Sequence, residues 1–256
     1  MELGNKNFCL ILGCTINPNN IRNLARRDAD LRLEDYKVSL KKWFKNSYVK
    51  KIVIIENSGH NLSELINISK KFENSKKIEF LSNDLNNNFA PELGKGYGES
   101  IILKEAVKNS SLLKESESFV HVSGRYYIKN FSNFINEFTN SQSDIFLNIS
   151  DNLRYSAANI YAGKKNFLID YVIPESEKIN DSNNYFFENC IASATLKAIL
   201  DNYKSKKWTS LQECFLDLAP TKKNGGGTTR EQRSQSVYNE AELLSNPPYE
   251  LSDDPA

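Results

Sequence analysis

The feature of this sequence that most constrains its fold is the alternation of short apolar runs with longer segments of helical period. The runs FCLILGCT (8–15), KKIVIIENSG (50–59) and KKIEFLSND (76–84) are typical of strands. Apolar residues recur three or four positions apart in the segments between them, as Leu33 and Tyr36 do. Strands that alternate with helices predict an α/β fold, with a mostly parallel, Rossmann-type sheet flanked by helices and right-handed crossovers.

The second half of the chain follows this pattern less regularly. SFVHVSGRYYIKNF (118–131) is expected to be a strand that runs into a polar turn. DIFLNIS (144–150) and SAANIYAGKKNFLIDYV (156–172) are expected to be later strands or edge pieces. An aromatic segment then leads into an amphipathic helix within 183–203.

Length and composition bound the domain organisation. A chain of 256 residues is long enough for one large α/β domain or two small ones. From Lys222 onward, Gly, Ser and Pro are frequent and core residues are few. We therefore predict one domain over 1–222 and a partly flexible C-terminal segment over 223–256.

Charge, cysteines and hydropathy exclude several classes of partner. The net charge of +1 gives no general attraction to nucleic acid. No window approaches the run of about 20 apolar residues that a membrane span needs. Four cysteines without a CxxC pair, and only two histidines, predict reduced thiols in a cytoplasmic protein and no histidine-rich metal site.

Four polar clusters fall near the carboxyl ends of the expected strands, at 13–15, 56–59, 94–99 and 121–127. The cluster at 94–99 leads into the next helix. In an open α/β sheet, the loops at the carboxyl ends of the strands lie along one edge and form the usual ligand crevice. The cluster at 56–59 has an alternative interpretation, in which Asn57 or Ser58 simply caps the next helix.

Two of these clusters have the chemistry of an anion site. The segment GKGYGE at 94–99 is expected to be a loop that leads into a helix. Gly96 in it would let backbone N–H groups near the helix N-terminus approach a phosphate, and Lys95 adds a positive charge. The segment is not a P-loop, because the GK[ST] ending is absent. Arg125 could form a bidentate pair with a phosphate or carboxylate, or an ordinary surface ion pair.

The order of IENSG, GKGYGE and SGRYY along the chain resembles that of bacterial GT-A glycosyltransferases of capsule and lipopolysaccharide synthesis. The resemblance covers roughly 8–189. It implies a GT-A-like fold in which Glu56 and Asn57 bind the base of a nucleotide-sugar donor. Thr15 would lie in the first loop of the site, and Arg32 near it. Ser123 and Gly124 take the place of the usual Asp-x-Asp motif.

The missing Asp-x-Asp motif bears on the metal requirement of such an enzyme. Its carboxylates would hold a divalent cation against the leaving phosphate. Here Arg125 stands in that neighbourhood, and a guanidinium can neutralise a departing phosphate. We therefore expect no metal-binding residues and no obligatory divalent metal, with a UDP-, GDP- or CMP-linked donor left open. Arg230 and Arg233 could close over the donor, unless they lie in a disordered tail.

An inverting transferase needs a carboxylate that accepts the proton of the acceptor hydroxyl. The resemblance places this base late in the domain, at the start of a helix, where NNYFFENC offers Glu188. Asp151 is the second candidate. Glu188 could instead be a residue that only complements the helix dipole.

The sequence thus predicts a glycosyltransferase that moves a sugar from a nucleotide donor to a surface-polysaccharide or lipopolysaccharide-type glycan. It would work in the cytoplasm without a transmembrane segment, and could associate with the inner face of the membrane, where lipid-linked acceptors lie. Two alternatives remain. One is a sugar nucleotidyltransferase, disfavoured because GCTINPNN (13–20) lacks Gly repetition and Lys or Arg. The other is a non-catalytic nucleotide- or glycan-binding protein of the same fold.

Overall fold

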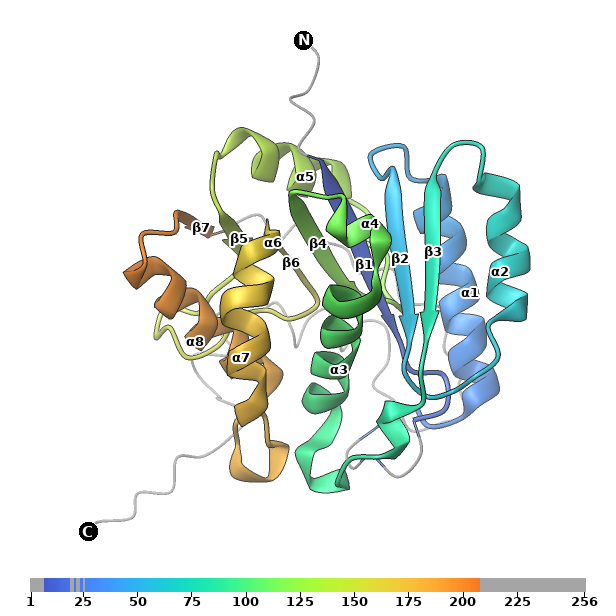
Figure 1. Cartoon of the computed structure of the whole chain (residues 1–256), viewed down its shortest axis with the longest axis horizontal. Coiled ribbons are helices and arrows are strands. Elements are labelled where there is room, and N and C mark those ends of the chain that lie inside the picture. The colour runs from blue at the N-terminus through green and yellow to red at the C-terminus, as the bar shows by residue number, and fades with distance from the viewer. Residues whose placement is uncertain (1–6, 19–20, 22–23, 25, 208–256) are drawn as a thin grey trace.

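The computed structural model describes residues 7–18, 21, 24 and 26–207, which form an α/β fold around one seven-stranded sheet (Figure 1). The strand order is β3-β2-β1-β4-β6-β5-β7, and the four strands from β3 to β4 are parallel. β6 is antiparallel to both of its neighbours, and β7 is parallel to β5. The strands are β1 (Phe8–Cys14), β2 (Lys51–Glu56), β3 (Lys77–Ser82), β4 (Ser118–Ser123), β5 (Ile145–Leu147), β6 (Ile160–Lys164) and β7 (Ser205–Lys207). The predicted fold class, a mostly parallel sheet flanked by helices, is confirmed.

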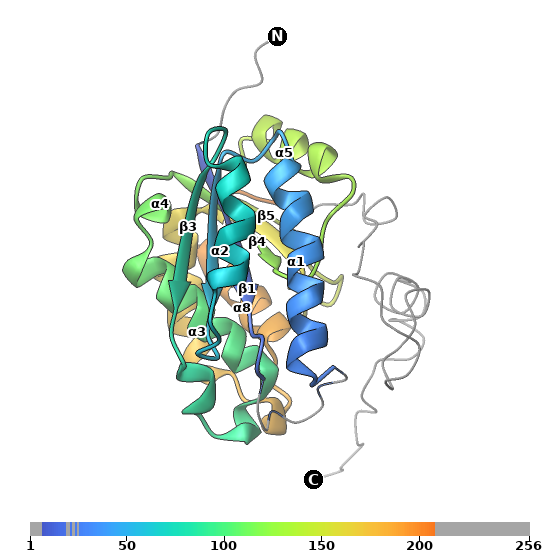
Figure 2. The ribbon, with the colours of Figure 1, turned by 90° about the vertical axis from the view of Figure 1, so that its right-hand side faces the viewer.

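Helices cover both faces of the sheet (Figures 1 and 2). The helices α1, α2 and α5 pack on one face, and α3, α4 and the later helices pack on the other. The helices are α1 (Ala29–Lys45), α2 (Ser63–Ser69), α3 (Gly94–Asn109), α4 (Ser111–Lys114), α5 (Phe131–Asn140), α6 (Lys165–Phe167), α7 (Ile173–Glu175) and α8 (Phe187–Leu200). A π-helical turn, Leu168–Val172, joins α6 to α7, and short 3₁₀ turns occur at Lys70–Phe72, Leu85–Asn87, Pro91–Leu93, Ser176–Lys178 and Asp181–Asn183.

The central strands supply both hydrophobic cores because successive side chains of a strand point to opposite faces. In β1, Leu10 and Leu12 belong to the core under α1, whereas Cys9 and Ile11 belong to the core under α3. All four side chains are fully buried. This two-sided burial is the reason why the strand reads as a continuous apolar run in the sequence.

Two predicted segments differ from the structure. The Gly-rich segment 94–99 was expected to be a loop, but it forms the first turns of α3. The segment 156–172 was expected to be strand, yet only Ile160–Lys164 is extended, and the chain continues as helix from Lys165. The predicted C-terminal segment, 223–256, lies outside the described residues.

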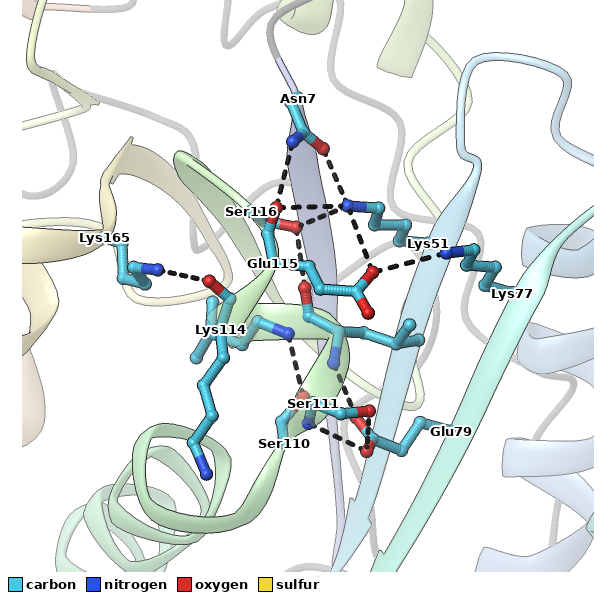
Figure 3. Close-up of polar contacts among 12 residues, drawn as sticks. Asn7, Lys51, Lys77, Glu79, Ser110, Ser111, Lys114, Glu115, Ser116 and Lys165 are labelled. Carbon is cyan, nitrogen blue, oxygen red and sulfur yellow. Dashed lines mark hydrogen bonds and ion pairs between the residues drawn. The ribbon is translucent and has the colours of Figure 1, made fainter.

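The amino edge of the sheet, opposite the predicted site, is fixed by a polar network (Figure 3). Glu79 of β3 accepts hydrogen bonds from the Ser110 hydroxyl (2.5 Å) and from the Ser111 backbone N–H (2.9 Å) at the start of α4. Burial works to raise the pKa of Glu79, but these hydrogen bonds outweigh it and lower the pKa. An open depression of about 680 Å³ lies at this edge. Charged side chains that line the depression pair with one another, as Lys164 and Asp144 do (2.7 Å).

Candidate functional site

The polar turns at the carboxyl ends of β1 and β2 meet the start of α3 through one buried side chain, Asn57. Its Oδ1 accepts a hydrogen bond from the Thr15 hydroxyl (2.7 Å), and its Nδ2 donates to the Gly98 carbonyl (2.9 Å). Asn57 is fully buried. Three of the sequence clusters are therefore joined at this edge, as the parallel topology predicts.

Glu56, the last residue of β2, shapes the loops around it. Its carboxylate accepts backbone hydrogen bonds from Ile16 (3.1 Å), Ser58 (3.1 Å) and His60 (2.9 Å), and it also contacts the Ser58 hydroxyl. The residue is fully buried. In this arrangement the carboxylate holds the chain itself, so its predicted contact with a nucleotide base stays a prediction.

A buried amide beside this junction has no hydrogen-bond partner within the described residues. Neither side-chain atom of Asn86 is hydrogen-bonded, although the residue is only 4% exposed. A Cβ on Gly98 would lie 3.0 Å from Asn86 Oδ1, so the amide faces the start of α3. A buried polar group without a partner costs free energy and calls for a ligand or water. Its place in an Asn-rich loop is the single local signal for this residue.

The turn after β4 packs directly on the end of β1. The Gly124 N–H donates to the Gly13 carbonyl (3.0 Å), and a Cβ on Gly124 would lie 2.3 Å from that same oxygen. Only glycine permits this approach. The neighbouring Ser123 N–H donates to the Asn159 carbonyl (3.3 Å). The predicted site residues Ser123 and Gly124 thus set where Arg125 emerges.

Three guanidinium groups gather around one carboxylate at the start of α1. Asp35 pairs with Arg26 (2.9 Å) and, at 3.6 Å, with Arg125. Arg32 Nε donates to the Thr15 carbonyl (2.5 Å), and its Nη1 donates to the Arg26 carbonyl (3.1 Å). We call Arg26, Arg32 and Arg125 the arginine cluster. The predicted residues Arg32 and Arg125 are brought together here, whereas Arg26 was not predicted.

Burial shifts the pKa values of several groups in and beside this cluster. Burial lowers the pKa of Arg32, and the nearby positive charge of Arg125 lowers it further, against the opposing effect of Tyr36. Burial raises the pKa of Asp35, although all three arginines act to lower it. Tyr36, whose hydroxyl accepts from the Thr15 N–H (2.8 Å), also has a pKa raised by burial. Asp35 pairs with two of the three guanidiniums, so the cluster itself carries an excess of positive charge, which favours an anion.

The predicted phosphate position at the start of α3 is occupied by a side chain of the protein. Gly94, at φ +77°, leaves no room for a Cβ because the Asp181 carboxyl group lies against it. Gly96 packs beside the same carboxyl group, and the Lys95 backbone acts to lower its pKa. Burial raises the pKa of Asp181, while Lys95, which is exposed, lowers it. Asp181 therefore already supplies the negative charge that this helix N-terminus favours.

The two candidate bases differ in their surroundings. Glu188 lies half-buried in the first turn of α8, and its carbonyl accepts a hydrogen bond from the Ser156 N–H (3.0 Å). Asp151 lies on an exposed turn, where it pairs with Lys207 (2.8 Å). The turn reaches the start of α8, because Asn189 Nδ2 donates to the Arg154 carbonyl (3.0 Å). Both catalytic roles stay predictions, and the Asp151 pair makes Glu188 the more available carboxylate.

An acid–histidine pair lies between α3 and the sheet, and its two residues fall within the predicted polar clusters at 94–99 and 121–127, although neither was predicted as a site residue. Glu99 Oε1 is 2.7 Å from Nε2 of His121, which is fully buried in β4. The Glu99 side chain is 23% exposed and lies over Gly13, whose Cβ position would be 3.0 Å from Oε1. No local signal joins these residues in the sequence, because α3 and β4 bring them together across 22 positions.

Other predictions concern the metal, the membrane and the tail. In the part of the chain that the structure describes, no three His, Cys, Asp or Glu side chains gather closely enough to hold a metal ion. No helix within the described ranges has both the length and the apolar character to span a bilayer. Arg230 and Arg233 lie outside the described residues.

Comparisons with known proteins find similar solved structures. Glycosyltransferase GlyE of Streptococcus pneumoniae has a TM-score of 0.48 at 8% identity, over 81% of this chain and 46% of that one. Core-mannan synthase A of Aspergillus fumigatus has a TM-score of 0.46 at 10% identity, over 92% and 86%. Inositol-1-phosphate CTP transferase of T. maritima has a TM-score of 0.44 at 13% identity, over 80% and 86%.

These similarities establish no activity for this chain, since identities and TM-scores are low. No family model matches the sequence. No curated protein matches it either. The function must therefore be argued from the site itself.

Proposed function

We propose that this protein is a glycosyltransferase that uses a nucleotide-activated sugar donor. The observation that carries the proposal is the arginine cluster at the carboxyl end of β1, in which Arg26 and Arg125 pair with the carboxylate of Asp35 and Arg32 binds the Thr15 carbonyl. Guanidinium groups bind phosphate bidentately and stay charged at all working pH values. The cluster is suited to a phosphate group that gains charge as it leaves.

The remaining parts of the site support the donor and the transfer. The unpartnered amide of Asn86, beside Asn57, offers both a donor and an acceptor to a nucleobase. As the acceptor oxygen bonds to the anomeric carbon, the bond from that carbon to the phosphate oxygen breaks, and the phosphate takes the electron pair. The hydroxyl proton passes to a carboxylate, for which Glu188 is the first candidate and Asp151 the second. The sequence resemblance supports a surface-polysaccharide or lipopolysaccharide glycan as acceptor, reached in the cytoplasm or at the inner membrane face.

A thermal-shift screen with UDP, GDP, CMP and TDP, each with and without Mg²⁺ or Mn²⁺, tests the donor site. A nucleotide at a hundred times its Kd should add about 2.7 kcal/mol to the free energy of unfolding. We expect one nucleotide to stabilise the protein without a metal. Arg125→Ala should weaken the binding of that nucleotide about tenfold or more. The variant loses a charged hydrogen bond, which contributes about 1.4 kcal/mol or more to the binding free energy.

Lys71→Ala is the matched control, because Lys71 is exposed on the turn before β3, away from the carboxyl edge. It should leave nucleotide binding unchanged. No stabilisation by any nucleotide would contradict the proposal. Release of pyrophosphate from a nucleoside triphosphate and a sugar phosphate would favour a nucleotidyltransferase instead, and nucleotide binding without transfer would favour a binding protein.

A further inference from the structure

The carboxyl edge of the sheet is divided into a cationic side and an anionic side. The arginine cluster packs with α1, whereas Glu99, Asp181 and Glu188 lie with α3 and α8 on the other face. Figure 2 shows α1 and α3 on these opposite faces, with the strands between them. Lys95 brings a positive charge to the anionic side, where it acts to lower the pKa of Asp181. The end of β1 lies where the two sides meet.

Glu99 is held in place by a buried partner. His121 Nε2 lies 2.7 Å from one of its carboxylate oxygens, and the His121 ring is fully buried between Tyr161 and Phe187. The other constraint is the backbone, since Asn57 holds the Gly98 carbonyl next to Glu99. A carboxylate fixed in this way is pre-organised to accept hydrogen bonds without an entropic cost at binding.

Fully buried polar atoms behind this carboxylate lack partners in the described structure. Nδ1 of His121 and the hydroxyl of Tyr161 have no hydrogen-bond partner there, although both residues are 0% exposed. The negative charge of Glu99 adds to the effect of burial in raising the pKa of Tyr161, so that hydroxyl lies in the field of the same carboxylate. Unsatisfied polar groups at this depth cost the fold free energy, so Glu99 lies on a polar layer that packing alone would not favour.

We infer that the transferred sugar lies against Glu99 and that the donor therefore carries a neutral or amino sugar and not an acidic one. The inference rests on the proposed function, because it assigns the two parts of the nucleotide-sugar donor to the cationic and the anionic side. The phosphate takes the arginine side, and the sugar attached to it reaches across the end of β1 to the carboxylate side. Sugar hydroxyls donate to a carboxylate, whereas a uronic or nonulosonic acid would bring a like charge to it and be repelled.

Paired donors that differ by one carboxylate test this directly. We would measure the Kd of UDP-glucose against UDP-glucuronic acid, and of GDP-mannose against GDP-mannuronic acid, using the nucleotide that the screen selects. CMP-linked sialic acid is tested against CMP alone. The neutral donor should bind at least tenfold more tightly than its acidic partner. The acidic sugar should add nothing to the affinity of CMP.

Glu99→Gln keeps an acceptor for His121 and removes the charge, so the ratio between the paired donors should fall toward one. The affinity for the free nucleotide should stay the same in this variant. Glu105→Gln is the matched control, because Glu105 lies on the same helix and its carboxylate accepts a hydrogen bond from Asn109 Nδ2 (2.6 Å), away from His121. It should leave the ratio unchanged.

Three results would overturn the inference. One is equal or tighter binding of the acidic donor by the unmodified protein, a measurement that does not depend on whether a variant folds. Another is a ratio that Glu99→Gln leaves unchanged. If no nucleotide binds at all, the proposed function fails and this inference fails with it, whereas nucleotide binding without discrimination defeats the inference alone.

Discussion

At the scale of single residues, the site depends on backbone contacts that tolerate no side chain. Gly124 lies so close to Gly13 that a methyl group would overlap the carbonyl oxygen of the neighbouring strand. Glu56 contributes through its side chain, because its carboxylate accepts hydrogen bonds from N–H groups of the surrounding loops. Both residues give the site its shape before any ligand arrives.

Gly124→Ala should destabilise the protein by about 1–3 kcal/mol, because the Gly13 strand or the turn must shift to relieve the overlap. Urea unfolding followed by circular dichroism measures this change. Ser123→Ala, one residue earlier, should stay within about 0.5 kcal/mol of the unmodified protein. Equal stability of Gly124→Ala and the unmodified protein would show that the close approach is not required.

At the scale of elements, α1 holds the turn that carries Arg125. The Trp43 indole N–H (2.8 Å) and the Ser39 hydroxyl (2.9 Å) both donate to the Tyr126 carbonyl. Asp28 caps the same helix by accepting from the Leu31 N–H. The helix therefore links the first loop of the site to the turn after β4.

Replacing both donors, in Trp43→Phe with Ser39→Ala, should leave the Tyr126 carbonyl without these partners and cost about 1–3 kcal/mol of stability. Nucleotide affinity should also fall, because the turn no longer holds Arg125 in place. Unfolding and nucleotide titrations of the same samples separate the two effects. Phe44→Leu, in the adjacent buried position of α1, should lower stability but keep nucleotide affinity. Unaltered affinity in the double variant would argue against this link.

At the scale of the whole molecule, the segment between β6 and α8 is held in place by a buried carboxylate. Glu175, 2% exposed, pairs with Lys178 (3.0 Å) and Lys197, and it accepts from the Tyr185 hydroxyl (2.6 Å) and the Ser193 hydroxyl (3.0 Å). Burial acts to raise its pKa, but the hydrogen bonds and lysines outweigh burial and lower the pKa to about 2.

The lowered pKa makes this part of the fold sensitive to acid. Because the pKa of Glu175 is below its unfolded value of about 4.3, its stabilisation is complete above that value. It is lost as the pH falls from there toward 2. Glu175→Gln should cost about 1–3 kcal/mol at pH 7 and flatten the dependence of unfolding free energy on pH in this window. Urea unfolding across pH 2–7 measures this dependence. If the variant and the unmodified protein show the same slope of unfolding free energy against pH, the lowered pKa of Glu175 is contradicted.

The sequence by itself determined the order of strands and helices in the parallel half of the sheet. It also placed the clusters around Thr15, Asn57 and Arg125 at one edge. These follow from periods of two and 3.6 residues and from the rule that parallel strands end together. The helical turns of 165–172 escaped prediction because their apolar residues are as compatible with a buried strand as with a buried helix.

Only the tertiary structure decided which side chains have partners. It set Asp181 against Gly94, which allowed a Gly-rich segment to begin a helix. The tertiary structure also brought the Glu56 carboxylate against the loop N–H groups and Arg26 into the arginine cluster. It placed Glu99 beside His121. The physical reason is that hydrogen bonds and burial depend on distances between residues far apart in the chain. Local spacing specifies which face or edge a residue occupies, but not what it meets there.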